Sequence, residues 1–150
     1  MSSSEIKERF EASVKDAMRA RDKQRLGVLR LIMSEFKRVE VDERIELDDT
    51  RVLVILDKMV KQRRDSLSQY EQADRQDLVQ QESFELDLLK EFMPEALDEA
   101  AVSAIIDQAI AETGASSMKD MGRLMGIVRP QVQGRADMGA ISTIVKQRLQ

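Results

Sequence analysis

The sequence predicts an all-helical fold with two helical subdomains. Helix-forming residues dominate the composition, apolar residues recur at intervals of three and four, and the β-branched residues form no alternating runs. Proline occurs only twice, and Pro94 disfavours helical backbone at the residue before it. We therefore expect an N-terminal bundle of about four helices over residues 1–95 and a C-terminal module of three helices over residues 96–150.

The first two helices of the N-terminal subdomain have clear start signals. A capping box formed by Ser2 and Glu5 predicts the start of the first helix, and Asp22 is placed to cap the second. Their apolar residues fall on one face of each helix: Ile6, Phe10, Val14, Ala17 and Met18 in the first, and Leu26, Leu29, Ile32, Met33, Phe36 and Val39 in the second. Residues 40–49 lose the helical period, so we expect a loop there.

A long third helix is predicted from Asp49 or Thr50 onward, and a fourth runs from residues 74–77 up to Pro94. Both have an inward apolar face: Val52, Leu53, Leu56, Met59, Val60, Leu67 and Tyr70 in the third, and Leu78, Val79, Leu86, Leu89 and Phe92 in the fourth. The middle of the third helix is cationic and could bind phosphate, but pairing with acids along the same helix is the interpretation we favour. The cations concerned are Lys58, Lys61, Arg63 and Arg64.

Three shorter helices are expected after Pro94, and each is too short to be stable without packing on the others. Each has a capping residue before its apolar stripe, and the first two have a Gly or Pro at the end. The starts are Asp98, Ser116 or Ser117, and Asp137, and the stops are Gly114 and Pro130.

The composition excludes several kinds of active site. The chain has no Cys and no His, which removes thiolate and imidazole chemistry and the usual zinc ligands. No nucleotide-binding fingerprint and no EF-hand spacing occurs, so we expect neither metal nor cofactor. Two pairs of carboxylates lie one turn apart and could do acid–base work, but a solvated helix face is the interpretation we favour for both. These pairs are Glu82 with Glu85 and Asp74 with Asp77.

The location expected from the sequence is the cytoplasm. No apolar stretch of a secretory signal peptide opens the chain, and no apolar run approaches the length of a membrane span. We therefore predict a cytoplasmic protein without membrane association, and we make no prediction of its oligomeric state.

Positive charge is concentrated near the C-terminus. The whole chain has a net charge of −4, yet residues 114–150 carry six Lys or Arg against two Asp. Gly122 and Gly126 remove side chains from one face of a predicted helix, and the turn at Gly134 leads to a helix N-terminus that suits a phosphate. We therefore predict a nucleic-acid-binding surface made by Lys119, Arg123, Arg129, Arg135 and Lys146, with Gly122, Gly126 and Gly134 allowing close approach. The alternative, which composition alone favours, is that these glycines only let three small helices pack and turn.

The same motifs resemble the GatB/YqeY family. They are Gly114-Ala-Ser-Ser117, Asp120-Met-Gly122, Met125-Gly126, Gly134-Arg-Ala-Asp137 and Ile144-Val-Lys146, together with Lys61–Ser66, Ala73–Leu78 and Glu82–Pro94 in the first half. The resemblance covers essentially the whole chain and is to the stand-alone YqeY-like proteins, which are similar to the tail of the amidotransferase B subunit. One departure is that the family commonly has Gly directly after Ala-Asp, where this chain has Met138 and then Gly139.

The resemblance implies a non-catalytic helical module associated with tRNA, or with the amidation of Glu-tRNA(Gln) and Asp-tRNA(Asn). Its basic C-terminal helices are then expected to bind the tRNA backbone. One alternative is a protein-interaction module for an amidotransferase or an aminoacyl-tRNA synthetase, with the third helix as its surface and no direct RNA contact. Another is a carbon–nitrogen ligase activity with glutamine as amido donor, which in the larger relative belongs to a separate domain.

Overall fold

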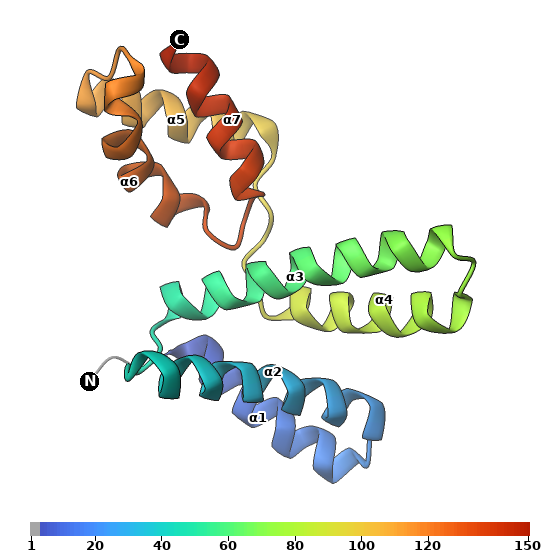
Figure 1. Ribbon diagram of the computed structural model, residues 1–150. Coiled ribbons are helices and arrows are strands. Elements are labelled where there is room, and N and C mark those ends of the chain that lie inside the picture. Colours follow the sequence, from blue (N-terminus) through green and yellow to red (C-terminus); the bar gives the residue numbers. More distant parts are fainter. Residues whose placement is uncertain (1–3) are drawn as a thin grey trace. The chain divides into compact units, whose positions relative to one another are not determined.

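Every regular element in residues 4–150, the range that the structure describes, is a helix. The computed structural model has seven α-helices and one short 3₁₀-helix over that range, which confirms the all-helical class (Figure 1). The chain divides into an N-terminal unit that ends at Met93 and a C-terminal module from Pro94 to Gln150. No helix of the described residues combines the length and the apolarity needed to cross a membrane.

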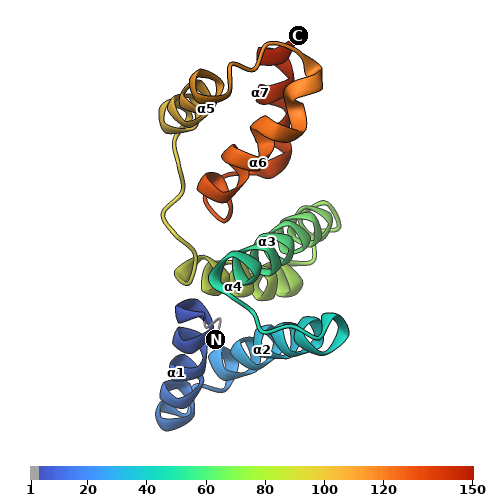
Figure 2. The ribbon, with the colours of Figure 1, turned by 90° about the vertical axis from the view of Figure 1, so that its left-hand side faces the viewer.

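Four helices build the N-terminal unit as two hairpins packed on each other (Figure 2). Their bounds are α1 Glu5–Ala20, α2 Lys23–Glu43, α3 Asp49–Gln72 and α4 Gln76–Glu91. Phe10 of α1 stacks on Phe92 with ring centroids 3.8 Å apart and meets Phe36 of α2 edge-on at 5.2 Å. Because these three buried rings come from α1, α2 and the end of α4, they join the two hairpins into one core.

Side-chain caps start three of these four helices. Ser4, Asp22 and Asp48 each accept a hydrogen bond from the backbone amide three residues later, at 2.9 to 3.1 Å. The prediction for Asp22 is confirmed, and Asp48 lies one residue before the predicted start of α3. The predicted cap Ser2 lies outside the described residues. Helix α4 begins after Arg75, which makes no side-chain cap.

The loop predicted over residues 40–49 is wrong in its first part. Helix α2 continues through Glu43 and ends at Arg44, whose backbone is left-handed with φ of 53°. The polar residues of this last turn are stabilised as helix by pairing one turn apart, since Arg38 donates to the carboxylate of Asp42 at 3.1 Å. Loss of apolar spacing therefore did not mean loss of helix.

The C-terminal module consists of three α-helices and a 3₁₀-helix packed around one apolar cluster. Their bounds are α5 Glu99–Thr113, η1 Met118–Asp120, α6 Met121–Val132 and α7 Met138–Leu149. Asp98 and Asp137 cap α5 and α7, and Gly114 ends α5 with φ of +67°, all as predicted. Ser117, one of the two predicted caps, stands directly before η1.

The end predicted for α6 at Pro130 is wrong, because the helix continues to Val132. Proline has no amide hydrogen, so the carbonyl of Gly126, four residues earlier, loses its usual helical donor. The helix ends two residues after Pro130, so the missing hydrogen bond affects a single carbonyl, that of the exposed Gly126.

Candidate nucleic-acid interface

Helix α6 separates a buried apolar face from an exposed face of glycine, arginine and proline residues. Its inward residues are Leu124, Met125, Val128 and Val132. Its outward residues are Gly122, Arg123, Gly126, Arg129 and Pro130. The helical spacing that packs the module therefore also turns both glycines outward.

The exposed glycines leave bare helix backbone on the surface. A Cβ atom added at Gly122 or Gly126 would meet nothing within 4 Å. Lys119 lies three residues before Gly122 and Arg129 three residues after Gly126, so a cation stands at each end of the bare segment. At about 1.5 Å per residue, Gly122 and Arg129 are roughly 10 Å apart along the axis of α6, and Lys119 lies in η1 directly before that helix. We call Lys119, Gly122, Gly126 and Arg129 the α6 strip.

Asp120 organises the loop that leads into the strip. Its carboxylate accepts hydrogen bonds from the amides of Ser116 at 3.0 Å and Ser117 at 3.4 Å, and from Arg123 at 2.9 Å. The hydrogen bond from the Ser116 amide, followed by those from Ser117 and the charge of Arg123, lowers the pKa of Asp120. Asp120 thus stabilises the loop before α6, and its carboxylate partly compensates the charge of Arg123.

Arg135 holds the turn between α6 and α7 to the start of the module. Its Nε donates to the carbonyl of Glu95 at 3.0 Å, and its own carbonyl accepts from the amide of Leu97 at 2.8 Å. Gly134 before it is buried and has φ of +77°, a conformation that favours glycine. Neither residue belongs to the α6 strip.

The helix N-terminus predicted as a phosphate site already has an anion. The carboxylate of Asp137 accepts from the amide of Gly139 at 3.1 Å, so the first turn of α7 is capped by the chain itself. The donor is the backbone amide of Gly139, which follows the departure from the family pattern at Met138.

The six cations of residues 114–150 fall into three groups. Lys119, Arg129 and Lys146 form no ion pair with any residue that the structure describes, and all three are exposed. Arg123 pairs with Asp120, and Arg148 pairs with Asp107. Arg135 binds a carbonyl, as described above. The structure therefore places Lys119 on η1, Arg123 and Arg129 on α6, and Lys146 on α7, which packs on η1.

A buried charge cluster in the N-terminal unit was not predicted. Arg63 of α3 places its Nε 2.9 Å from the carboxylate of Glu85 and 3.7 Å from that of Glu82, both on α4. The side chains of these three residues are 12–18% exposed, so the solvated helix face predicted for the two acids is wrong. The intrahelical pairing predicted for Arg63 is also wrong. Arg63 and the two acids pair across the α3–α4 hairpin, and the spacing of residues along one helix does not reveal such a pair.

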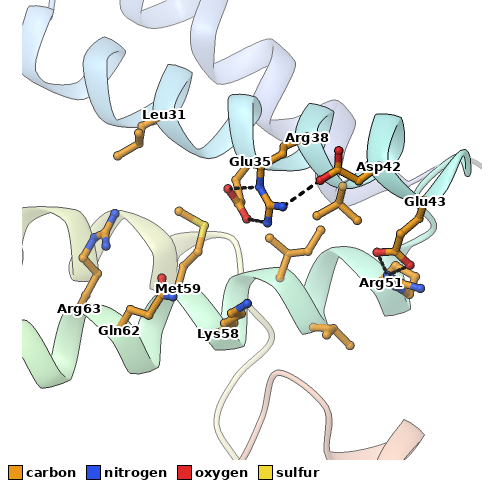
Figure 3. A pocket seen from close by; sticks show the side chains of 13 residues that line it. Leu31, Glu35, Arg38, Asp42, Glu43, Arg51, Lys58, Met59, Gln62 and Arg63 are labelled. Atoms are coloured by element: carbon orange, nitrogen blue, oxygen red, sulfur yellow. Dashed lines mark hydrogen bonds and ion pairs between the residues drawn. The ribbon is translucent and has the colours of Figure 1, made fainter.

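A groove of about 430 Å³ lies between α2 and α3, and its charged residues pair mainly with one another (Figure 3). Arg38 donates to Glu35 and to Asp42, and Arg51 donates to Glu43 at 2.6 and 2.7 Å. No group of three or more acidic, His or Cys side chains placed to hold a metal occurs among the described residues.

A sequence model of the Yqey-like protein family matches residues 7–149. The chain belongs to the YqeY-like family. The resemblance to the YqeY-like proteins noted from the motifs is thereby confirmed.

The YqeY-like chain is similar to several fungal proteins named Altered inheritance of mitochondria protein 41, mitochondrial. It is 27% identical to the Pyrenophora tritici-repentis protein over 130 residues, which cover 85% of this chain and 71% of that protein. It is 27% identical to the Clavispora lusitaniae protein over 139 residues, covering 91% and 81%. With the Eremothecium gossypii protein it shares 35% identity over 81 residues, but these span only 53% of this chain and 44% of that protein.

The names of these relatives contradict the cytoplasmic location predicted from the sequence, because they are named as mitochondrial proteins. The prediction rested on the lack of an apolar signal-peptide segment and of a membrane span. Those observations bear on secretion and membrane insertion, whereas mitochondrial targeting segments are amphipathic and rich in Arg and Ser.

Proposed function

We propose that this YqeY-like protein is a non-catalytic module that binds the double-helical backbone of tRNA through the α6 strip. The observation that carries the proposal is the α6 strip itself, in which bare helix backbone lies between Lys119 and Arg129. Cations bind phosphate without regard to sequence, and bare backbone allows the closest approach of a helix to a ribose-phosphate chain.

The distribution of charge over the module supports this surface. Helix α5 carries three acids and no cation, whereas α6 and α7 together carry four cations and no acid. A module that is neutral or slightly acidic as a whole therefore presents cations on two of its three helices. A polyanion approaching α6 meets Lys119, Arg123 and Arg129 before it meets the acids of α5.

The backbone of the α6 strip also suits RNA. Because Pro130 has no amide hydrogen, the carbonyl of Gly126 lacks its usual donor on the exposed face. A ribose 2′-hydroxyl can donate to such a carbonyl, and the wide, shallow minor groove of A-form RNA displays these hydroxyls. No aromatic side chain stands on α6, so stacking on unpaired bases is not part of the proposal.

Relatedness to the amidotransferase tail supplies the biological setting of the proposal. We place the protein beside the amidation of Glu-tRNA(Gln) or Asp-tRNA(Asn), where it holds tRNA and a partner performs the chemistry. An amidotransferase or an aminoacyl-tRNA synthetase is the class of partner that this setting implies.

A titration of labelled bulk tRNA into the protein at two salt concentrations tests the proposal. We expect binding at low salt that weakens steeply as salt rises, because phosphate contacts release counterions. The double substitution Lys119→Glu with Arg129→Glu should weaken binding by about tenfold or more and lower the salt slope by about two. Arg135 is unsuitable for this test, because its guanidinium holds the turn of the module.

The matched control is Lys23→Glu with Lys90→Glu, which reverses two exposed charges on α2 and α4, outside the cationic cluster of α3. It should leave tRNA affinity within about twofold of the starting protein. Absence of binding at low salt would sink the proposal, and so would equal loss of affinity in the two double variants.

A further inference from the structure

A second groove, of about 630 Å³, lies along the α1–α2 hairpin. Each helix contributes a stripe at spacings of three and four residues: Glu11, Val14, Lys15 and Met18 from α1, and Arg30, Met33, Ser34 and Lys37 from α2. Such stripes form parallel ridges on two neighbouring helices, with the groove between them.

The groove is on the side of α2 that is turned away from α3. The residues of α2 that line the α2–α3 groove include Leu31, Glu35 and Arg38. Arg30 and Ser34, which line the present groove, each directly precede one of those residues in the sequence. One residue corresponds to a rotation of about 100° around the helix axis. No other helix of the N-terminal unit contributes to its lining, so the groove is open on its outer side.

The floor of the groove is apolar and adaptable. Met18 is 53% exposed, which is high for a large apolar side chain, and Val14 and Met33 are half-buried. Methionine fits irregular apolar partners because its side chain is unbranched and flexible. No aromatic residue lines the groove, so it offers no stacking platform for a nucleic-acid base.

The rim of the groove is cationic. Lys15, Arg30 and Lys37 form no ion pair with any residue in the range 4–150, and Glu11 is the one acid among the lining residues. Other exposed cations of the unit, Lys23 and Lys61 among them, also form no ion pair with a described residue, so the rim is distinguished by three cations that gather beside an apolar floor. Within a chain of net charge −4, an apolar floor is thus bordered by three positive charges and one negative charge.

We propose that this groove binds an acidic amphipathic helix of a partner protein. Apolar side chains at spacings of three and four would enter between the ridges and cover Met18, Val14 and Met33. Acidic residues flanking that apolar stripe would reach the rim cations Lys15, Arg30 and Lys37. The inference concerns α1 and α2 and is independent of the tRNA surface on α6; it also differs from the third-helix surface expected from the sequence.

The probe for this proposal is a pair of synthetic amphipathic helical peptides with the same leucine stripe. One peptide has Glu on both flanks of the stripe, and its twin has Lys at the same positions. Methyl-labelled methionine reports the site in the full-length protein, because Met18 and Met33 line the groove while Met125 is buried in the C-terminal module. We expect the acidic peptide to shift the Met18 and Met33 signals saturably, and the basic twin to bind at least about tenfold more weakly.

Two charge variants locate the interaction. Arg30→Glu with Lys37→Glu should weaken binding of the acidic peptide about tenfold, and Lys61→Glu with Arg64→Glu on α3 should leave it unchanged. Equal binding of both peptides to the unaltered protein overturns the proposal, as does a missing response at Met18 and Met33. Shifts of these two methionines by anionic phospholipid vesicles, without any by the acidic peptide, would assign the groove to a membrane surface instead.

Discussion

The Nε atom of Arg63 on α3 lies 2.9 Å from a carboxylate oxygen of Glu85 on α4, inside the hairpin that these two helices form. Glu82 lies one turn from Glu85 and reaches the same guanidinium only at 3.7 Å. The buried oxygen of Glu82 and the Nε of Arg63 make no aligned hydrogen bond within the described residues. One cation thus serves two carboxylates, and the two acids are not equivalent.

This inequality predicts that two similar substitutions differ in their effect on stability. Glu85→Gln removes the close partner of a mostly buried guanidinium and should lower the free energy of unfolding by about 2 kcal/mol. Glu82→Gln removes a repelled and poorly hydrogen-bonded charge and should change it by less than about 0.5 kcal/mol, or raise it. Denaturant unfolding followed by the fluorescence of Tyr70, the one tyrosine, reports the N-terminal unit alone.

Asp87→Asn is the control for that comparison, because Asp87 is exposed on the same helix. Its effect should stay within about 0.5 kcal/mol. If Glu82→Gln proved as damaging as Glu85→Gln, the two acids would contribute equally and the distances would be misleading about their energies.

Glu82 should contribute to the pH dependence of the free energy of unfolding. Burial raises the pKa of this carboxyl, the nearby Glu85 adds to the rise, and Arg63 opposes it. The folded unit therefore holds this proton above the ordinary pKa of 4.5, where the unfolded chain has released it. The contribution of Glu82 to the free energy of unfolding therefore falls as pH rises from 4.5 through the folded-state pKa. The gain of Glu82→Gln over the unaltered protein should grow across that window in denaturant titrations and then level off.

Glu40 should show the reverse dependence. Burial alone would raise its pKa, but the hydrogen bond and charge of the Lys7 ammonium, at 3.0 Å, outweigh it and lower the pKa. Its contribution is therefore present above pH 4.5 and lost as pH falls through the lower folded-state pKa. Glu40→Gln should cost about 1 kcal/mol at neutral pH, and the cost should shrink in acid. A cost that stayed constant down to low pH would mean that the charge of Glu40 is not what matters.

Signals contained in a few neighbouring residues predicted their structures well. Asp22, Asp98 and Asp137 cap helices as expected, and Gly114 has the left-handed backbone expected of a helix stop. Each of these features depends on hydrogen bonds within about four residues, so the local sequence suffices. The family motifs likewise contain Asp120, whose hydrogen bonds to Ser116 and Ser117 are local.

Features that depend on packing between helices could not be predicted from the local sequence. The pairing of Arg63 with Glu85 requires the register of α3 against α4, and the contact of Arg135 with Glu95 joins residues 40 positions apart. The continuation of α6 past Pro130 depends on how near the proline lies to the helix end. For the predicted binding surface, the sequence supplied the cations and glycines, but only the structure separates Lys119 and Arg129 from Arg135, which has a structural contact.

Gly126 offers a test in which stability and binding should move in opposite directions. A methyl group at this position meets no neighbour and the residue lies inside a helix, so Gly126→Ala should stabilise α6 by about 0.5–1 kcal/mol, measured by amide hydrogen exchange. Gly27→Ala in α2 is the matched control, because Gly27 is also exposed, helical and without neighbours. Both variants should gain stability, but only Gly126→Ala should lose tRNA affinity, since its methyl group stands where the RNA backbone must approach. Unchanged tRNA affinity in Gly126→Ala would show that binding does not require close approach to the backbone at this position.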